Sequence, residues 1–256
     1  MKKSSLSVVV IAKNEGEFIK DCLESVKWAD EIVLLDGGSI DQTVAIARQY
    51  GARIVPQKTK VMDFAAWHNQ GKEEVKNKWL LYLDADEQVT ADLRKEMEKM
   101  IKRNDNLAAY AMPRRNFLLG QELKYGGWYP DYQIRLFKKD RLVKWEGRLH
   151  ERPVFEGRLD YLNKPMIHLT HRSLSTMVEK TKKWSEIEAS LLFRNHHPPM
   201  VWWRILRMMI SEFFWRFGKQ QAWRDRTVGW IEGVFQVFNR SLIYIRLWEL
   251  QKKKWN

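Results

Sequence analysis

The chain has 256 residues, of which 45% are hydrophobic, so it is long enough for one large domain or a domain with an appendage and too apolar for wholesale disorder. Cys22 is the one cysteine, which excludes a disulfide framework. No run of about 18 apolar residues occurs, and the apolar run near the N-terminus is too short for a signal peptide. We therefore expect a cytoplasmic protein without a membrane span.

The first hundred residues alternate between two patterns. Short β-branched or apolar runs predict buried strands, and longer segments with one apolar stripe predict helices. The predicted strands are 7–11, 31–35, 53–55 and 79–83, and the predicted helices are 16–27, 41–50, 64–75 and 90–100. Strands that alternate with helices of this length imply right-handed crossovers and a parallel sheet covered on both faces.

The rest of the chain changes character twice. Residues 110–169 contain short strand-like segments and Gly-rich turns, and the sequence becomes helical after Ser173. The helical part is interrupted by His196-His197-Pro198-Pro199, the best candidate for a linker. We expect an α/β domain over 1–195, with halves 1–100 and 101–195, followed by a helical, amphipathic region over 196–256.

Acidic residues follow three of the predicted strands. Glu15 comes after the first strand, Asp36 after the second, and Asp84, Asp86 and Glu87 after the fourth. The carboxyl ends of parallel strands meet at one edge, where ligands bind. Crowded carboxylates repel one another, and a divalent cation would offset that repulsion and bridge the acids to phosphates. The alternative is that the last three acids cap the next helix, but Thr90 already supplies a cap there.

Several functional classes fit the sequence poorly. No G-x-G-x-x-G follows the first strand and no G-x-x-x-x-G-K-[ST] occurs, which argues against a dinucleotide fold and a P-loop. A nucleotidyltransferase would explain the acids, but AKNEGEF is not the Gly-rich, basic loop that it needs. A nucleic-acid-binding protein would explain the net charge of +13. The acids at three strand ends would repel nucleic acid, so we predict no such partner.

A series of sequence motifs carries a family resemblance. AKNE, DGGSIDQT, DFAAWHNQG and WLLYLDADE, in this order over residues 5–90, resemble a family 2 glycosyltransferase of the GT-A fold. PRRNFLLG, GGWYPDYQIRLFKK, LHE, a later histidine and RTVGWIEGVFQVFNRSLIYIRLWE are similar to bacterial lipopolysaccharide core β-1,4-glucosyltransferases. The resemblance implies a mostly parallel sheet flanked by helices, with a nucleotide-sugar half over 1–100 and an acceptor half over 101–195. It also implies inverting transfer of a hexose, with glucose favoured, from a UDP-sugar to a lipopolysaccharide-core or other lipid-linked acceptor.

The resemblance assigns donor-binding roles to the strand ends and to the third helix. Ala12, Asn14 and Glu15 would lie against the uridine, and Asp36 would accept the uracil N–H. Glu15 has an alternative role as a cap of the first helix, and Asp41 is a helix cap rather than a ligand.

The resemblance also assigns the diphosphate and metal contacts. Asp63 and Asn69 would open the helix that approaches the base and diphosphate, and Asp84 would face the ribose or donor sugar. Asp86 would bind Mg²⁺ or Mn²⁺. His168 is preferred as the second metal ligand, because neutral imidazole is a suitable ligand, with a purely structural role as the alternative.

The acceptor half contains the candidate acids for catalysis. The turn of residues 126–131 presents Trp128 and Asp131, a combination that suits a hexose. The alternative is a packed turn with an exposed Asp131. Inverting transfer needs a carboxylate that takes the proton of the acceptor hydroxyl. We predict that Glu151 is this base and that Asp131 holds the sugar, although Glu151 has a structural role as its alternative. Arg135 faces phosphate or lies on the polar face of its strand.

The C-terminal region is basic and aromatic. Residues 200–217 are mostly apolar, and Arg204, Arg207 and Ser211 form a narrow polar stripe. This pattern predicts an interfacial helix that binds anionic lipid. We expect residues 200–256 to hold the protein on the inner face of the plasma membrane. The alternative is packing against the catalytic domain or a second copy, so a homo-oligomer stays open.

Overall fold

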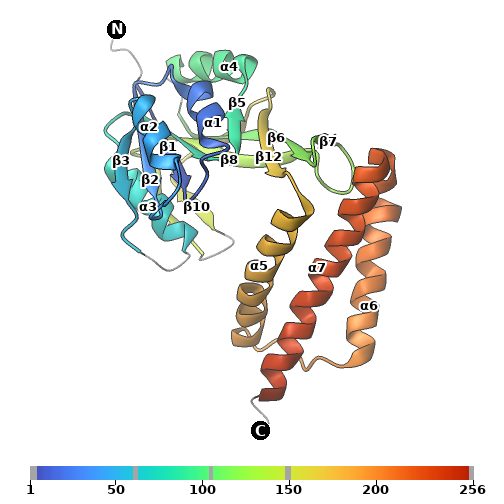
Figure 1. The fold of residues 1–256 in the computed structure, drawn as a ribbon. Helices are drawn as coiled ribbons and strands as arrows, with labels where there is room; N and C mark the ends of the chain where they lie inside the picture. Colours follow the sequence, from blue (N-terminus) through green and yellow to red (C-terminus); the bar gives the residue numbers. More distant parts are fainter. Residues whose placement is uncertain (1–4, 60–62, 104–105, 148–150, 254–256) are drawn as a thin grey trace. The chain divides into compact units, whose positions relative to one another are not determined.

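The computed structural model describes residues 5–59, 63–103, 106–147 and 151–253, which form two compact units (Figure 1). Unit 1 contains Met1–Arg114 and Asp131–His168, and unit 2 contains Arg115–Pro130 and Leu169–Asn256. The sequence predicted a domain boundary between residues 195 and 196, and this position lies inside unit 2. The functional division at that point stays a prediction.

The first half of unit 1 is the predicted parallel sheet. Its strands are β1 (Leu6–Ala12), β2 (Glu31–Asp36), β3 (Arg53–Pro56) and β4 (Trp79–Asp84), in the order β3-β2-β1-β4. Its helices are α1 (Ile19–Val26), α2 (Thr43–Gln49), α3 (Phe64–Glu74) and α4 (Ala91–Lys102). The Thr90 side chain accepts the N–H of Leu93 and so caps α4, as predicted. The α1 helix begins three residues later than expected, because residues 16–18 form a turn.

Further strands extend this sheet. They are β5 (Glu87–Val89), β6 (Leu107–Leu118), β8 (Asp131–Lys138) and β12 (Met166–His171), and the full order is β3-β2-β1-β4-β8-β6-β12-β5. β11 (Arg158–Tyr161) pairs with β6, and β9 (Leu142–Glu146) and β10 (Arg152–Phe155) form a separate two-stranded sheet. The three-residue β5 carries no periodic pattern that the sequence could have revealed.

The sheet of unit 1 is apolar on both faces. Successive side chains of a strand point to opposite faces, so Val8 and Val10 join one core cluster with α1, while Val9 and Ile11 join another beside α3. All four valine and isoleucine side chains are buried. This two-faced burial explains the continuous apolar runs and confirms the expected sheet flanked by helices.

Unit 2 is mainly helical. β7 (Gln121–Leu123) pairs with the end of β6, and the helices are α5 (Leu174–Arg194), α6 (Trp202–Phe213), the π-helical η1 (Phe214–Lys219), the 3₁₀ turn η2 (Ala222–Asp225) and α7 (Arg226–Lys253). α7 lies between α5 and α6 (Figure 1), and Ala189, Ile205 and Leu247 bring the three helices into one cluster. The helical C-terminal region is therefore confirmed.

Glycines in α7 permit a close approach to the preceding segment. A Cβ atom at Gly229 would lie 2.0 Å from the carbonyl oxygen of Ala222, and one at Gly233 would lie 2.6 Å from the Phe217 ring. The spacing in RTVGWIEGVF thus has a packing explanation. Among the described residues, none of the helices combines the length and apolar character that a membrane crossing requires.

Candidate active site

The carboxyl ends of β1, β2 and β4 meet at one edge of the unit 1 sheet. The strand register places Ala12 opposite Asp36, and Ile11 opposite Asp84. Asp36 and Asp84 are the last residues of their strands. The convergence of acidic strand ends that the sequence predicted is therefore present, and it brings Ala12, Asp36 and Asp84 together.

Hydrogen bonds tie the loops after β1 and β2 to each other. The Asn14 N–H donates to Ser39 Oγ at 2.9 Å, and Asn14 Oδ1 accepts the N–H of Ile40 at 2.9 Å. The Asp36 carboxylate accepts the N–H groups of Gly38 and Ser39, each at 3.1 Å. Asn14 has a φ of 56°, a left-handed conformation that asparagine tolerates. These bonds hold two of the predicted uridine-binding residues in one preformed loop pair.

Glu15 and Asp41 also connect these loops. The Glu15 N–H donates to Thr43 Oγ1 at 2.8 Å, and the Glu15 carbonyl accepts the N–H of Ile19, the first residue of α1, at 2.9 Å. The Asp41 carboxylate accepts the N–H groups of Gly16 and Thr43 at 2.9 and 3.0 Å. Asp41 therefore holds the first N–H of α2, but the N-cap position itself is Gln42, so the cap role of Asp41 stays a prediction.

Helix α3 presents the third group of predicted donor residues. The Asp63 side chain accepts the N–H of Ala66 at 2.9 Å and caps the helix. Asn69 lies in the middle of α3, where its amide donates to the carbonyl of Trp145 at 3.0 Å and accepts the N–H of Trp145 at 2.8 Å. Both ends of the amide therefore attach α3 to β9. Donor contacts of Asp63 and Asn69 stay predictions.

His68 is part of the core beneath this helix. It is 1% exposed, its Nδ1 lies 2.8 Å from the carbonyl oxygen of Phe64, and its ring stacks on Trp145 with centroids 4.2 Å apart. Burial lowers the pKa of His68 to about 4, so the imidazole is neutral near physiological pH. Its contacts are those of a packing residue.

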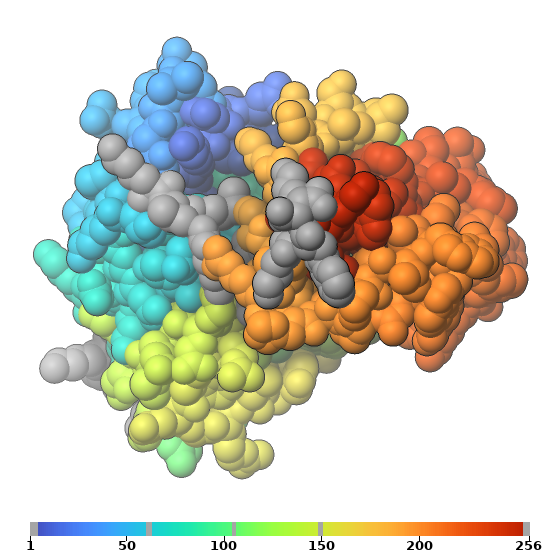
Figure 2. Space-filling view, turned by 90° about the horizontal axis from the view of Figure 1, so that it is seen from below, coloured from blue at the N-terminus to red at the C-terminus, as the bar shows by residue number. Residues whose placement is uncertain are grey.

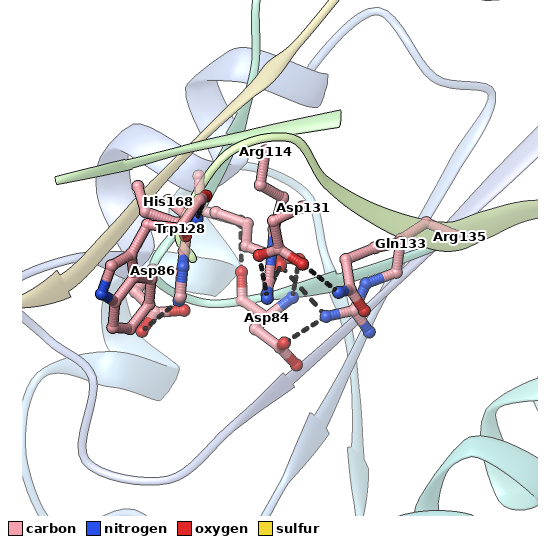
Figure 3. A network of polar contacts seen from close by, with 11 residues as sticks. Asp84, Asp86, Arg114, Trp128, Asp131, Gln133, Arg135 and His168 are labelled. Atoms are coloured by element: carbon pink, nitrogen blue, oxygen red, sulfur yellow. Dashed lines mark hydrogen bonds and ion pairs between the residues drawn. The ribbon is translucent and has the colours of Figure 1, made fainter. Parts of the chain in front are cut away.

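Two arginines balance the acids at the end of β4 (Figure 3). Glu87 is fully buried, and its Oε1 accepts hydrogen bonds from Arg114 and Arg135, each at 3.0 Å. Glu87 Oε2 accepts the N–H of Asp84 at 3.0 Å. Arg135 also donates to Asp84 Oδ2 at 2.5 Å. The charge balance that the sequence assigned to a cation is thus supplied for Asp84 and Glu87 by arginines of β6 and β8.

The network keeps Asp84 and Arg135 charged. Burial acts to raise the pKa of Asp84, but the Arg135 guanidinium holds that pKa below its ordinary value. Burial acts to lower the pKa of Arg135, and the charges of Asp84 and Glu87 raise it above its ordinary value. The charge of Glu151 raises the pKa of Arg135 further. The predicted base therefore lies within electrostatic range of this network.

Asp131 is anchored at the start of β8. Its Oδ2 accepts hydrogen bonds from Arg114, with Nη2 at 2.7 Å, and its Oδ1 accepts one from Gln133 at 2.7 Å. Both oxygens thus have donors, which suits a carboxylate that is held in place. The residues 148–150 beside Glu151 lie outside the described part of the chain, so the alternative pairing of Glu151 with Arg148 lies there too.

Asp86 and His168 form a second pair at the same edge. His168 pairs with Glu87 across β12 and β5, and His168 Nε2 lies 3.6 Å from Asp86 Oδ2. Two donors that bind one cation at about 2.1 Å lie about 3 to 3.6 Å apart, so this spacing fits two ligands of one metal ion. No group of three or more His, Cys, Asp or Glu side chains suited to a metal gathers among the described residues. Further ligands would be substrate oxygens and water, which hard cations readily bind.

Trp128 belongs to unit 2. It packs against a cluster that contains Leu118, Leu123 and Met177, and its carbonyl accepts a hydrogen bond from the Asn116 amide at 2.9 Å. Packing within unit 2 is therefore enough to explain why an aromatic residue occupies position 128. Stacking of Trp128 on a sugar stays a prediction.

Sequence reasoning missed Arg114 as a member of the site. Glu87 was included among the acids at this edge, but its pairing with two arginines was not predicted. The doublet Arg114-Arg115 in an otherwise apolar strand was the available signal. Arg114 is largely buried and Arg115 is more exposed, which agrees with the alternation of side chains along β6.

Comparison with known proteins identifies the family of this chain. The model of glycosyl transferase family 2 matches residues 7–154. The lipopolysaccharide core biosynthesis glycosyltransferase LpsC of Rhizobium meliloti is 25% identical over 95% of this chain and 93% of its own length. An uncharacterized glycosyltransferase of Rickettsia bellii is 25% identical over 96% of this chain and 86% of its own.

One solved structure supports the fold. A crystal structure of a mycobacterial protein aligns with 76% of this chain and 76% of its own, at 16% identity and a TM-score of 0.51. The family model covers more than half of the chain, including the strand ends that carry Asp36, Asp84 and Asp86. The family and the enzyme class implied by the sequence motifs are confirmed: the chain belongs to glycosyl transferase family 2.

Proposed function

We propose that the protein is an inverting glycosyltransferase that transfers a hexose from a UDP-sugar to a lipopolysaccharide-core or other lipid-linked acceptor, with glucose as the first donor sugar to test. The convergence of Asp36, Asp84 and Asp86 at one sheet edge of a family 2 chain carries this proposal. The name of the relative LpsC supports the acceptor class.

The preformed loops after β1 and β2 suit the nucleoside. In the proposal Ala12, Asn14 and Glu15 lie against the uridine, and Asp36 accepts the uracil N–H. The hydrogen bonds between these loops support this role, because a loop pair already ordered loses little entropy on binding. Asp63 and Asn69 approach the base and diphosphate from α3, and Asp84 faces the ribose or donor sugar.

Asp86 and His168 are proposed to hold Mg²⁺ or Mn²⁺ against the diphosphate. The 3.6 Å between their donor atoms supports this assignment. When bound, the cation neutralises the diphosphate and the charge that develops on the leaving UDP. Arg135 neutralises Asp84 and Glu87 at the same edge, which reduces the repulsion between these acids and the diphosphate.

Glu151 is proposed to be the base. In a single displacement the acceptor oxygen forms a bond to the anomeric carbon as the bond to UDP breaks, and Glu151 takes the hydroxyl proton. Asp131, fixed by Arg114 and Gln133, holds a sugar hydroxyl. The donors on both Asp131 oxygens support this division, because they hold the Asp131 carboxylate in one orientation.

A donor panel tests the proposal. The full chain is mixed with UDP-hexoses, purified lipopolysaccharide core and either Mg²⁺ or Mn²⁺, and the released UDP and the glycosylated core are detected by mass spectrometry. We expect transfer from one UDP-hexose, with an inverted anomeric configuration in the product, and loss of transfer in EDTA. Transfer with retained configuration, or transfer that is unaffected by EDTA, would contradict the mechanism.

Helices α6 and α7 are proposed to bind the membrane that carries the acceptor. α6 exposes Trp202, Leu206, Ile210 and Phe213 along one side, and Trp202 is 76% exposed. α7 exposes Trp230, Val234, Phe238, Ile245 and Trp248. Exposed apolar stripes of this length mark an interaction surface. In this proposal the protein is cytoplasmic and peripheral on the inner face of the plasma membrane.

Vesicle flotation tests this surface. Leu206→Asp/Ile210→Asp should abolish flotation with phosphatidylglycerol vesicles, while Leu174→Asp/Val178→Asp, which changes exposed side chains of α5, should leave it intact. The absence of binding by the wild-type chain would contradict the membrane role. Sedimentation as a dimer that the α6 variant disrupts would assign the same surface to a second copy instead.

A further inference from the structure

Unit 2 contains a basic groove that the proposed chemistry does not use. It has a volume of about 430 Å³ and lies between α6, α7 and the segment before α6. Its walls include Arg204 and Arg207 from α6, Arg240 from α7, and the aromatic residues Trp203 and Tyr244. Figure 2 shows α6 beside the C-terminal end of α7, viewed from below. Two helices thus bring three guanidinium groups and two aromatic rings to one cavity.

The positive charge of this groove is only partly balanced. Glu212, the acid in its wall, pairs with Arg216 at 2.8 Å. Arg204 donates to the carbonyl of Pro199 at 3.1 Å. Within the part of the chain that the structure describes, Arg207 and Arg240 form no hydrogen bond or ion pair. Two guanidinium groups are therefore available to an anion, and their planar donor geometry matches phosphate oxygens.

The groove and the exposed apolar stripe of α6 lie on different sides of the helix. At about 100° per residue, the mean direction of Arg204, Arg207 and Ser211 is about 140° from that of the exposed apolar stripe of α6. A bilayer that contacts the stripe therefore leaves the groove turned away from its headgroups. This arrangement favours an anion that extends from the membrane on a glycan over a phospholipid headgroup.

The other walls suit a saccharide. Trp203 is 45% exposed, and its ring is flanked by Arg204, whose guanidinium carbon lies 5.3 Å from the ring centroid. Tyr244 and Ser211 add a second ring and a hydroxyl. Aromatic faces pack against sugar C–H groups, and a few placed polar groups fix a ligand in a concave site.

We propose that this groove binds a phosphate group carried on a saccharide of the acceptor. Arg207 and Arg240 bind the phosphate oxygens, and Trp203 and Tyr244 pack against the sugar. The inference rests on the proposed function, because the acceptor is there a lipid-linked glycan. It adds that the acceptor is phosphorylated and that unit 2 recognises the phosphate.

Chemical protection locates the site. Phenylglyoxal modifies accessible arginines, and peptide mass spectrometry reports the extent at each position. We expect glucose 6-phosphate, but not glucose, to protect Arg207 and Arg240, while Arg48 and Arg103 of unit 1 are modified equally in both samples. Equal modification of Arg207 and Arg240 with and without glucose 6-phosphate would overturn the proposal.

Paired variants measure the contribution of the two arginines. Arg207→Gln/Arg240→Gln should weaken glucose 6-phosphate binding at least about tenfold in calorimetry, since a hydrogen bond to a charged group contributes about 1.5 to 3 kcal/mol. Arg48→Gln/Arg103→Gln removes the same charge from unit 1 and should leave the affinity unchanged. Equal losses in both variants would indicate a nonspecific charge effect and overturn the proposal.

Two further measurements are needed. The first distinguishes a saccharide phosphate from a lipid headgroup, and the second distinguishes failure of the groove proposal from failure of the proposed function. If flotation with phosphatidylglycerol vesicles falls in Arg207→Gln/Arg240→Gln while glucose 6-phosphate affinity does not, the ligand is a headgroup and the saccharide assignment fails. UDP binding is measured in the same samples and should be unchanged. A wild-type chain that binds glucose 6-phosphate at Arg207 and Arg240 but not UDP would contradict the proposed function alone.

Discussion

The two units differ in the charge that they bury in ion pairs and in the amount of apolar surface that they expose. Unit 1 buries Glu87 and Arg135 and joins them in a network with Asp84 and Arg114. Unit 2 exposes large apolar side chains, including Trp202 at 76%. Buried, paired charge costs desolvation energy, so its presence at the strand ends marks a site where orientation matters. Exposed apolar surface costs energy in water, so it marks a surface that a partner covers.

Glu232 shows what happens to a buried acid in unit 2. Gln236 donates to its Oε1, but its Oε2 is buried without a hydrogen-bond partner among the described residues. Burial raises the pKa of Glu232 to about 7. Asp84, with Arg135 beside it, has a lowered pKa. Glu232 is 3% exposed, whereas the Asp84 side chain is 38% exposed and paired with Arg135, so burial and the ion pair both act to separate the two pKa values.

The largest expected effect belongs to unit 1. Asp86→Ala should reduce transfer by roughly a thousandfold or more, because the proposed cation loses a ligand and the diphosphate charge is left unbalanced. UDP release with a lipopolysaccharide-core acceptor measures the loss, and Asp92→Ala, which removes an exposed acid of α4, is the control. Activity that survives both Asp86→Ala and chelation would contradict the proposal of a metal site in unit 1.

The second prediction contrasts a buried arginine with an exposed one. Arg135→Met leaves Glu87 and Asp84 without one of their partners and should lower the free energy of unfolding by about 3 to 5 kcal/mol. Arg115→Met breaks the more exposed pair with Glu122 and should cost about 1 kcal/mol or less. Urea unfolding of both variants provides the test. Similar losses would mean that the network does not contribute more than a surface pair.

The third prediction concerns Glu232 and pH. The folded state keeps the Glu232 proton up to about pH 7, whereas the unfolded chain releases it near the ordinary glutamate pKa of 4.5. The free energy of unfolding should therefore fall as pH rises from about 5 to 8, by up to about 3 kcal/mol. Glu232→Gln should remove this dependence, while Glu249→Gln, an exposed change on the same helix, should retain it. An unchanged slope in Glu232→Gln would contradict the assignment.

The smallest effect separates the two acids of the acceptor half. Glu151→Gln should keep UDP binding and lower kcat by roughly a hundredfold. Asp131→Asn should mainly raise the acceptor KM, because it loosens a carboxylate that Arg114 and Gln133 hold. Steady-state kinetics with varied acceptor distinguish the two. If the phenotypes are exchanged, Asp131 is the base and Glu151 the positioning residue.

The sequence indicated the parallel half of unit 1 and the site edge because their signals are local. An uninterrupted β-branched run such as 7–11 is only stable as a strand buried on both faces, and the acids at 36 and 84 follow directly from where the strands end. The apolar stripes of α6 were similarly visible, since side chains recur on one side of a helix with a fixed period.

Only the tertiary structure decided which groups neutralise those acids. Arg114 and Arg135 are separated from Glu87 by 27 and 48 residues, and β5 is too short to have a readable period. The partner of a buried charge depends on which strands become neighbours, and strand order is set by packing over the whole sheet. For the same reason the arginines of α6, which the sequence assigned to lipid, were placed in a groove by the packing of α6 against α7.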